Sequence, residues 1–327
     1  MKYLGDSMIS KGNLYRRYSD YLKEKYGEKV YKLPINLPVT CPNRDGVAGC
    51  GGCTFCGDEG AGFENLSNLI PVSEQIHQNK AYISKKYKAK KFIAYFQNFS
   101  NTYMPLDVFK EVMEQAAKED IVQLAISTRP DCIREEYLQF LSELKNKYNI
   151  DIAIELGLQT VNSHSLIKIN RGHTLAEFID AVLRIKKYGF EICAHLILNL
   201  PWDTRMDVIE SAKIISALSI NQVKLHSLYI VENTVMGEQY KNKEFDMISV
   251  EEYKRRVIDF LEYLSPDIVV QRLIGRAPEE NTLFVNWNMS WWKIRDEIEE
   301  EMRANNYYQG RLCNYLNGKA VRHFFGH

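Results

Sequence analysis

Apolar positions in this chain gather into short continuous runs, and longer amphipathic segments separate these runs. The apolar runs have the length of strands and lie at 30–37, 91–96, 121–127, 150–158, 191–200, 223–231 and 268–273. The segments between them carry apolar residues at helical spacing and lie at 72–90, 106–118, 135–148, 175–188, 205–218 and 250–264. Continuous apolar strands that alternate with helices predict βαβ units and a parallel sheet covered on both faces.

This repeat predicts an α/β fold, a partial or full (β/α) barrel of about six to seven units. A short helix at 14–26 precedes the first strand, and a helix at 293–305 lies in a tail with Trp287, Trp291 and Trp292. We therefore expect an N-terminal helical extension at 1–28, a barrel at 29–275 and a C-terminal cap or docking segment at 276–327.

Total charge does not select a partner, because Lys+Arg and Asp+Glu both number 42. Only local patches could favour a nucleic acid. No apolar run reaches the roughly 18 residues of a membrane span, and the N-terminus lacks the apolar core of a signal peptide. We expect a cytoplasmic protein without a membrane partner. Thiols stay reduced there, so the seven cysteines are not a disulfide framework.

The loop after the first predicted strand concentrates Cys41, Cys50, Cys53 and Cys56. It follows a strand, so it lies at the mouth of the sheet where α/β active sites form. Its many glycines let the chain wrap a compact object and point amide N–H groups inward, as the sulfurs of an iron–sulfur cluster require. A structural zinc ion is the alternative, although its usual fourth Cys or His ligand is not evident.

The loop and several motifs together resemble the radical SAM (S-adenosylmethionine) superfamily. The matching segments are CPNRDG…GGCTFC in the loop, YFQNFSNTY (95–103), ISTRPDC (126–132), ELGLQTV (155–161), INRGH (169–173) and KLHSLY (224–229). The usual CxxxCxxC spacing is lengthened here, which is typical of the branch similar to the elongator catalytic subunit. The sequence of the loop is similar to that of the YhcC/YtqA-type subfamily, and the resemblance covers about residues 25 to 300.

The resemblance implies a [4Fe–4S] cluster held by Cys41, Cys53 and Cys56. Cys50 also forms a CxxCxxC series with Cys53 and Cys56, so a competing set of three ligands exists. Three thiolates leave one iron open, and in the family the amino and carboxylate groups of SAM bind that iron. Reductive cleavage of SAM then gives a 5′-deoxyadenosyl radical, with an electron donor such as a flavodoxin or ferredoxin.

Polar residues near the ends of the predicted strands are the candidates for contacts to SAM. Glu155 lies inside an apolar strand, where a carboxylate is costly unless it has a partner or a ligand. Arg171 matches a family position that meets the SAM carboxylate, and a guanidinium fork suits that role. Phe55 could otherwise be ordinary packing, and Gln97 and Asn98 could cap a turn. The full predicted set is Phe55, Gln97, Asn98, Ser127, Thr128, Glu155, Gln159 and Arg171.

Lys224 and His226 are the candidate catalytic residues, because they lie two residues apart on one face of a strand. A buried lysine also needs a partner. His195, Gln271 and Arg272 could line the same cavity, although a lone buried histidine is more often a satisfied core residue.

Two stretches, 80–91 and 303–323, mix basic residues with tyrosines, as RNA-binding surfaces do. The alternative for the first stretch is an ordinary solvated helix. The family resemblance points to tRNA as the partner and to conversion of 5-carboxymethylaminomethyl-uridine to 5-aminomethyl-uridine at the wobble position. A radical SAM enzyme that acts on a small metabolite or a protein, and a zinc-stabilised RNA-binding module, stay open as alternatives.

Overall fold

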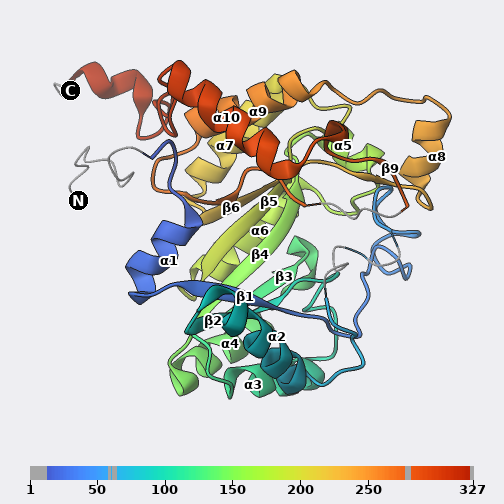
Figure 1. The fold of residues 1–327 in the computed structure, drawn as a ribbon, viewed down its shortest axis with the longest axis vertical. Coiled ribbons are helices and arrows are strands. Elements are labelled where there is room, and N and C mark those ends of the chain that lie inside the picture. Colours follow the sequence, from blue (N-terminus) through green and yellow to red (C-terminus); the bar gives the residue numbers. More distant parts are fainter. Residues whose placement is uncertain (1–12, 58–59, 61–64, 277–280, 325–327) are drawn as a thin grey trace.

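A seven-stranded parallel sheet forms the centre of the computed structural model, which describes residues 13–57, 60, 65–276 and 281–324. Its strands follow chain order, and the two edge strands do not pair with each other. The sheet curls into an open half-barrel (Figure 1), which confirms the partial-barrel prediction. The strands are β1 (Val30–Ile35), β2 (Lys91–Phe96), β3 (Gln123–Thr128), β4 (Asp151–Gln159), β5 (Glu191–Ile197), β6 (Gln222–His226) and β8 (Val269–Arg272).

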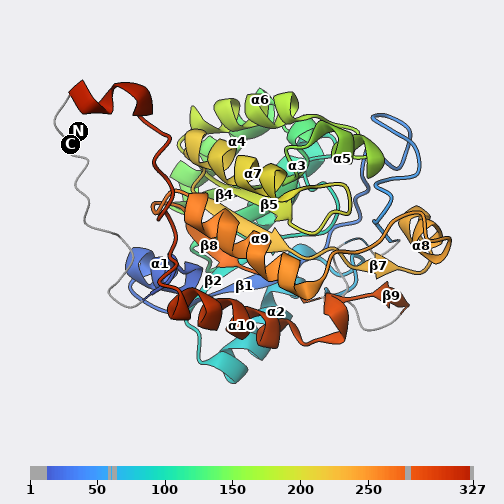
Figure 2. The same cartoon turned by 90° about the horizontal axis from the view of Figure 1, so that it is seen from above.

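Helices cover the outer face of the curled sheet (Figure 2). They bury apolar residues spaced by about one turn, as Phe109 and Met113 of α3 show, which are both fully buried. Thr174 caps α6 and exchanges hydrogen bonds with Glu177 in a capping box, which fixes where that helix begins. The covering helices are α2 (Val72–Tyr87), α3 (Leu106–Ala117), α4 (Glu135–Tyr148), α6 (Leu175–Lys186), α7 (Arg205–Ala217) and α9 (Val250–Tyr263).

The inner face of the sheet carries polar side chains at matched positions of neighbouring strands. In the parallel register, Ser127 of β3 pairs with Glu155 of β4, and His195 of β5 pairs with Lys224 of β6. Residues at one register position project to the same side of a sheet. The hollow of the half-barrel is therefore lined by polar groups, while the helix-covered side holds the apolar core.

The N-terminal and C-terminal segments flank the open edge of the half-barrel. The segment before α1 (Tyr18–Tyr26) lies along β8, where the backbone N–H of Val270 donates to the carbonyl of Arg16 at 2.8 Å. The sequence predicted that this helix begins at residue 14. Because the residues before Tyr18 pair with β8 instead, α1 begins at Tyr18. Helix α10 (Trp291–Ala304) packs on α9 in the C-terminal tail.

One predicted strand, 223–231, is wrong as a single element. The chain forms β6, leaves the sheet at Ser227, and then forms β7 (Ile230–Val231), which pairs antiparallel with β9 (Thr282–Phe284). The break is stabilised by side chains. The N–H of Leu228 donates to Oδ1 of Asn199 at 2.6 Å, and the hydroxyl of Ser227 contacts Oδ1 of Asn286 at 2.6 Å.

Shorter elements complete the described chain. They are α5 (Ser163–Lys168), α8 (Val235–Lys241) and the 3-10 turns Pro130–Cys132, Asn286–Asn288 and Lys319–Phe324. Residues 1–12 of the predicted N-terminal extension, and residues 277–280 and 325–327 of the predicted cap, lie outside the described residues. The predicted domain boundaries stay predictions. In the described part of the chain, no helix combines the length and apolar character that crossing a membrane requires.

Candidate functional site

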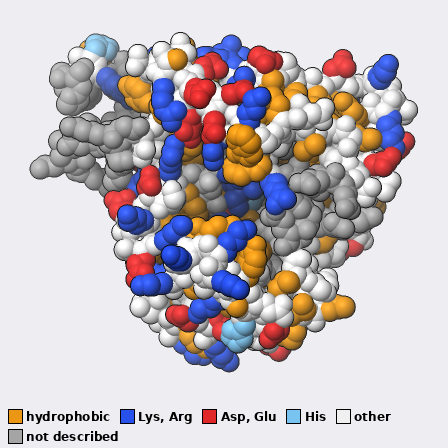
Figure 3. Space-filling model, in the orientation of Figure 1, with side chains coloured by type: hydrophobic (Ala, Val, Ile, Leu, Met, Phe, Trp, Pro, Cys, Tyr) orange, Lys and Arg blue, Asp and Glu red, His pale blue; other side chains and the backbone are white. Residues whose placement is uncertain are grey.

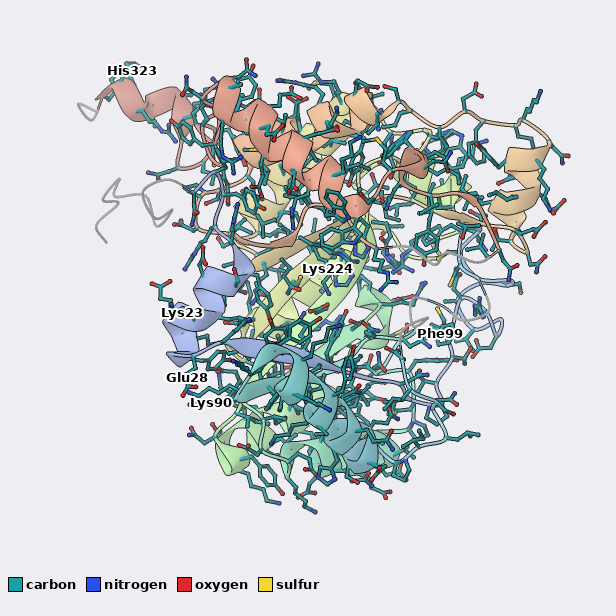
Figure 4. The ribbon with its side chains drawn as sticks, viewed as in Figure 1. Lys23, Glu28, Lys90, Phe99, Lys224 and His323 are labelled. Atoms are coloured by element: carbon teal, nitrogen blue, oxygen red, sulfur yellow. The ribbon has the colours of Figure 1, made fainter. Side chains whose placement is uncertain are left out.

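A cavity of about 270 Å³ opens at the carboxyl ends of the strands and contains most of the residues singled out in the sequence. Figure 4 places Lys224 over the middle of the sheet and Phe99 towards the loop that carries the cysteines. Both residues line the cavity, so it extends between these two regions. Its walls include Cys41, Cys53, Cys56, Phe55, Gln97, Ser127, Thr128, Glu155, Gln159, Arg171, His195, Lys224, His226 and Arg272.

Backbone hydrogen bonds hold the cysteine loop in place. The N–H of Thr54 donates to the carbonyl of Ile169 at 3.0 Å, and the N–H of Met236 donates to the carbonyl of Thr54 at 2.8 Å. The segment between Cys53 and Cys56 is therefore fixed to the end of α5 and to the start of α8. Within the loop, the N–H of Cys56 donates to the carbonyl of Cys53 at 2.9 Å.

A cationic or amide donor faces each of the three cavity-lining sulfurs. Nη1 of Arg171 lies 3.4 Å from Sγ of Cys53, and Nδ2 of Asn43 lies 3.6 Å from the same sulfur. Nη2 of Arg44 lies 3.8 Å from Sγ of Cys56. Nη1 of Arg129 lies 4.0 Å from Sγ of Cys41. Such donors stabilise thiolates and the sulfur ligands of an iron–sulfur cluster.

Cys50 lies apart from this arrangement. Its side chain is exposed and does not line the cavity, and its residue forms a β-bridge with Asp45 within the loop. The geometry therefore favours Cys41 over Cys50 as the third member of the set. The assignment of Cys41, Cys53 and Cys56 as metal ligands stays a prediction.

The spacing of the sulfurs bears on the zinc alternative. Four ligands at about 2.3 Å from one zinc ion would bring sulfurs within about 4 Å of one another. Among the described residues, the one group of His, Cys, Asp and Glu whose ligand atoms all lie within 4.8 Å is Glu155, Cys193 and His195. The three loop cysteines are not such a group, so at least one of their sulfur–sulfur separations exceeds 4.8 Å, as expected for ligands of different irons in a cluster. The donor set fits a [4Fe–4S] cluster.

Seven of the eight predicted SAM-contacting residues line the cavity, and Asn98 does not. Asn98 is buried, and its Nδ2 donates to Oδ1 of Asn36 at 3.1 Å. Gln97 lines the cavity and donates to Oδ1 of Asn65. Gln159 reaches the cavity next to a bulge in β4, where its φ of 76° departs from strand geometry. Contact of any of these residues with SAM stays a prediction.

Arg129 lines the cavity and forms an ion pair within its own turn. Its Nε and Nη2 donate to the two carboxylate oxygens of Asp131 at 2.9 and 2.7 Å. Its Nη1 also donates to the carbonyl of Arg171 at 2.8 Å, so it connects β3 to the segment that carries Arg171.

Glu155 is the centre of a buried network inside the half-barrel. Its side chain is 1% exposed, and Oε1 lies 2.5 Å from Nζ of Lys32. Oε2 lies 2.6 Å from Nζ of Lys224 and 2.8 Å from Nε2 of His195. Burial alone would raise the pKa of Glu155, but the charges of Lys224 and Lys32 outweigh it and hold the pKa well below its usual range. Both oxygens are thus engaged by protein side chains.

The two candidate catalytic residues lie in different environments. Lys224 is bound to Glu155 and also donates to the hydroxyl of Tyr95 at 2.9 Å. Nδ1 of His226 lies 2.8 Å from Nη2 of Arg272. Burial, followed by the charge of Arg272, holds the pKa of His226 well below its usual range, so its ring is neutral at pH 7. Their catalytic roles stay predictions.

The sequence reasoning missed several residues in the cavity or next to it. Lys32 is a charged residue within the apolar strand VYKLPI. A charged residue inside an apolar strand is the signal that singled out Glu155, so the same reasoning could have identified Lys32. Tyr95 could not, because a tyrosine within an apolar strand is common in cores. Arg44 lies between two candidate cysteines, and only its approach to Cys56 reveals its place.

A second hollow, the lateral groove, lies along the open edge of the half-barrel and has a volume of about 830 Å³. Arg272 and Arg276 line both hollows, so the lateral groove adjoins the cavity. Figure 3 shows basic side chains gathered around the hollow between α10 and β1. The basic and aromatic residues that line it are Arg17, Lys29, Lys32, Arg272, Arg276, Arg295, Tyr15, Tyr18, Tyr31 and Trp291, and the acids are Asp296 and Glu299.

Neither of the two basic and tyrosine-rich stretches predicted from sequence supplies a lining residue of the lateral groove. In the first, Lys80 pairs with Asp120 at 2.8 Å, and Lys86 lies 3.1 Å from the hydroxyl of Tyr82. In the second, Arg311 is paired with Glu262. Several of their charges are thus engaged locally.

Comparison with known proteins agrees with this geometry. The radical SAM superfamily model matches residues 35–215, and the radical SAM C-terminal domain model matches residues 220–304. The uncharacterized protein YtqA of Bacillus subtilis is 34% identical over 94% of this chain and 95% of its own length. The tRNA uridine(34) acetyltransferase of Methanocaldococcus jannaschii is 29% identical over 43% of this chain and 26% of its own length.

Solved structures share the fold. The Elp3 protein of Methanocaldococcus infernus superimposes with a TM-score of 0.65 and 14% identity, over 86% of this chain and 64% of that one. Enzymes of this family bind a [4Fe–4S] cluster and SAM, and the three cavity cysteines fit the cluster. A family model that matches more than half of the chain and a relative that matches nearly all of it place the protein in one family. The chain belongs to the radical SAM superfamily and is an enzyme of that family.

Proposed function

We propose that this radical SAM enzyme acts on tRNA and modifies the side chain of the wobble uridine, converting 5-carboxymethylaminomethyl-uridine to 5-aminomethyl-uridine. The observation that carries the proposal is the lateral groove, which is basic and aromatic and adjoins the cavity of the cysteines. Basic side chains neutralise phosphates, and aromatic rings stack on unpaired bases.

The charge of the lateral groove differs from that of the chain as a whole. The chain is neutral overall, yet the groove is lined by Arg17, Lys29, Lys32, Arg272, Arg276 and Arg295 against Asp296 and Glu299. Some of these cations are held by neighbours: Arg17 pairs with Glu299 at 2.8 Å. Others lie against aromatic rings: Nζ of Lys29 lies 5.0 Å from the ring centre of Tyr31. A concentrated basic surface on a neutral protein favours a polyanionic substrate.

The relatives point to the same class of substrate. One relative is named as an acetyltransferase of tRNA uridine 34, and it is 29% identical over 43% of this chain. Uridine 34 is the wobble position. The chemistry need not be shared with that enzyme, but recognition of a uridine in an anticodon loop would use the same kind of cavity.

The cavity residues support a division of roles. Cys41, Cys53 and Cys56 would hold the cluster, and Arg171 with Ser127, Thr128, Gln97, Gln159 and Phe55 would bind SAM beside it. When bound, the cluster and SAM supply a 5′-deoxyadenosyl radical, given an electron from a small flavin or iron–sulfur protein. The network of Glu155, Lys32 and Lys224 would fix the floor of the cavity and keep bulk water from it.

Nucleoside analysis of tRNA tests the proposal directly. Deletion of the gene should lead to accumulation of 5-carboxymethylaminomethyl-uridine, and the purified, reconstituted enzyme should convert that tRNA only with SAM and a reductant. Unchanged wobble nucleosides together with reductant-dependent 5′-deoxyadenosine would instead indicate a small metabolite or a protein as the substrate. A variant with Lys224→Met should keep the cluster and lose turnover, which tests the predicted catalytic role.

A further inference from the structure

Arg272 is a cation in the centre of the molecule that lacks an anionic partner. It lies at the end of β8 and lines both the cavity and the lateral groove. Its Nη2 donates to Nδ1 of His226 at 2.8 Å. Its Nε is buried and has no hydrogen-bond partner among the described residues. Among those residues, no carboxylate lies within the 4.0 Å of an ion pair.

The other charged groups of the cavity are engaged at most of their polar atoms, although Nε of Arg171 is also buried without a hydrogen-bond partner among the described residues. Arg129 forms a two-point ion pair with Asp131, and Arg171 donates to the carbonyl of Gly157 at 2.7 Å and faces Cys53. Glu155 is held by Lys32 and Lys224. The side chain of Arg272 is only partly buried, but its buried Nε has no acceptor, and a buried donor without an acceptor is costly. The arrangement therefore indicates a site that a ligand completes.

The surroundings of Arg272 suit an anionic oxygen ligand. Nη2 of Arg272 lies 2.8 Å from Nδ1 of His226 and 3.3 Å from Nε2, so the guanidinium lies against the ring and Nδ1 is the nearer acceptor. With Nδ1 accepting, the proton of this neutral imidazole lies on Nε2. Gly275 allows the guanidinium to pack closely against the backbone, since a Cβ there would lie 3.3 Å from Cζ of Arg272. The guanidinium fork matches the two oxygens of a carboxylate.

We propose that Arg272, together with His226, binds the carboxylate of the substrate. The inference rests on the proposed function and deepens it, because the carboxymethylamino group of the substrate nucleoside ends in a carboxylate. Arg272 lines both the lateral groove and the cavity, so a base bound at the boundary of the two would bring this group to the guanidinium. The product lacks the carboxylate and so lacks this contact, which would favour its release.

A binding experiment with a small probe tests the site independently of tRNA. N-methylglycine carries the same secondary amine and carboxylate as the substrate side chain, and methylamine lacks the carboxylate. The ring signals of His226, identified by their loss in H226Q, are followed by NMR in the reconstituted enzyme with saturating SAM. N-methylglycine should shift them in the wild type and in the control R295Q, and methylamine should not. R272Q should abolish the shift, and R272K should weaken binding at least about tenfold because lysine lacks the fork.

Three outcomes would overturn the carboxylate site. N-methylglycine could leave the His226 signals unchanged. Inorganic phosphate could shift them as strongly, which would assign Arg272 to the RNA backbone. Addition of SAM could remove the response, which would assign Arg272 to the SAM carboxylate. Equal SAM binding by wild type and R272Q shows that the variant is folded.

Kinetics then separate this inference from the proposed function. With the modified tRNA, R272Q should raise KM about 10-fold to 100-fold, as expected for loss of a hydrogen bond to a charged group. If tRNA is not a substrate at all, the proposed function fails, and the response to N-methylglycine still decides whether a carboxylate binds at Arg272.

Discussion

Lys32 on the first strand of the sheet and Glu155 on the fourth meet across the interior of the half-barrel, with Nζ 2.5 Å from Oε1. Lys32 also donates to Oε1 of Gln271 on the last strand at 2.8 Å. The two edge strands do not pair through their backbones. These side chains therefore connect the two edges and the middle of the open sheet, and they define the floor of the cavity.

The first prediction concerns the anion at the centre of this network. Glu155→Gln removes the negative charge and leaves Lys32 and Lys224 buried without it. Removal of one partner from a buried ion pair typically destabilises a protein by about 3–5 kcal/mol, and urea unfolding of the reconstituted protein measures the change. Glu210→Gln is the matched control, because the pair of Glu210 with Lys213 lies at the surface at 3.5 Å. The control should cost less than about 1 kcal/mol. Equal effects of the two substitutions would show that the buried network contributes little.

The second prediction concerns which cysteines hold the cluster. Separate substitutions of Cys41, Cys53 and Cys56 by Ala should each reduce bound iron from about four atoms per chain to well below one. Cys50→Ala should keep the iron and the brown colour, because this side chain is exposed and does not line the cavity. Cys313→Ala is a control outside the cavity. Loss of iron in Cys50→Ala with retention in Cys41→Ala would reverse the assignment.

The third prediction is a pH dependence that arises from His195. Burial, followed by the charge of Lys224, lowers the pKa of His195 to about 4, against its ordinary value of 6.5. The unfolded chain therefore binds more protons between these two values, so the free energy of unfolding should fall as the pH is lowered from 6.5 towards 4. The groups that face the ring are Glu155, Lys224, Arg272 and His226.

Urea unfolding at several pH values between 5 and 7 measures this dependence. His195→Gln should reduce the slope by up to about 1.4 kcal/mol per pH unit, the value for one proton. The control His323→Gln replaces an exposed histidine near the C-terminus (Figure 4) and should leave the slope unchanged. An unaltered slope in His195→Gln would mean that other groups cause the acid sensitivity.

The repeat of strands and helices was largely predictable, because each strand is a continuous apolar run and each helix has one apolar face. The cavity followed from the same rule, since strand ends in a parallel sheet meet at one edge. The break after β6 was not predictable, because it depends on Asn199 and Asn286, which are distant in sequence from Ser227. Local apolarity continues through the break and hides it.

The lateral groove was also beyond sequence reasoning. It joins the segment around Arg17 to helix α10, and Arg17 contacts Glu299 across 282 positions of sequence. Neither segment has a basic character that distinguishes it from other surface helices. Only the curl of the sheet, which leaves β1 and β8 apart, brings these residues to one edge.

The fourth prediction tests the lateral groove as a path for RNA. Lys29→Glu reverses an exposed charge that lines the groove, so it should weaken tRNA binding and reduce the slope of log K against log salt by about one. Lys23→Glu reverses an exposed charge of α1 that does not line the groove (Figure 4) and should have little effect. Fluorescence anisotropy with labelled tRNA at several salt concentrations gives both quantities. Equal losses in the two variants would indicate a general charge effect and not a specific path.

The fifth prediction concerns how closely the chain packs behind the cysteine loop. Gly172 and Gly189 both have positive φ, 73° and 65°, so an alanine at either position should cost about 1–2 kcal/mol through the backbone alone. A Cβ at Gly189 meets nothing within 4 Å, whereas one at Gly172 would lie 2.4 Å from Oδ1 of Asn43. Asn43 donates to the carbonyl of Asn170 at 2.5 Å and faces Cys53, so its displacement should move the loop.

Gly172→Ala should therefore destabilise the protein more than Gly189→Ala and should also reduce the iron retained after reconstitution. Gly189→Ala should retain its iron, because its added methyl group points into open space. Urea unfolding and iron determination on the two variants separate the shared backbone term from the specific contact with Asn43. If both variants lose the same stability and keep the same iron, Asn43 does not support the cysteine loop. The arrangement of donors around Cys53 would then depend on Arg171 alone.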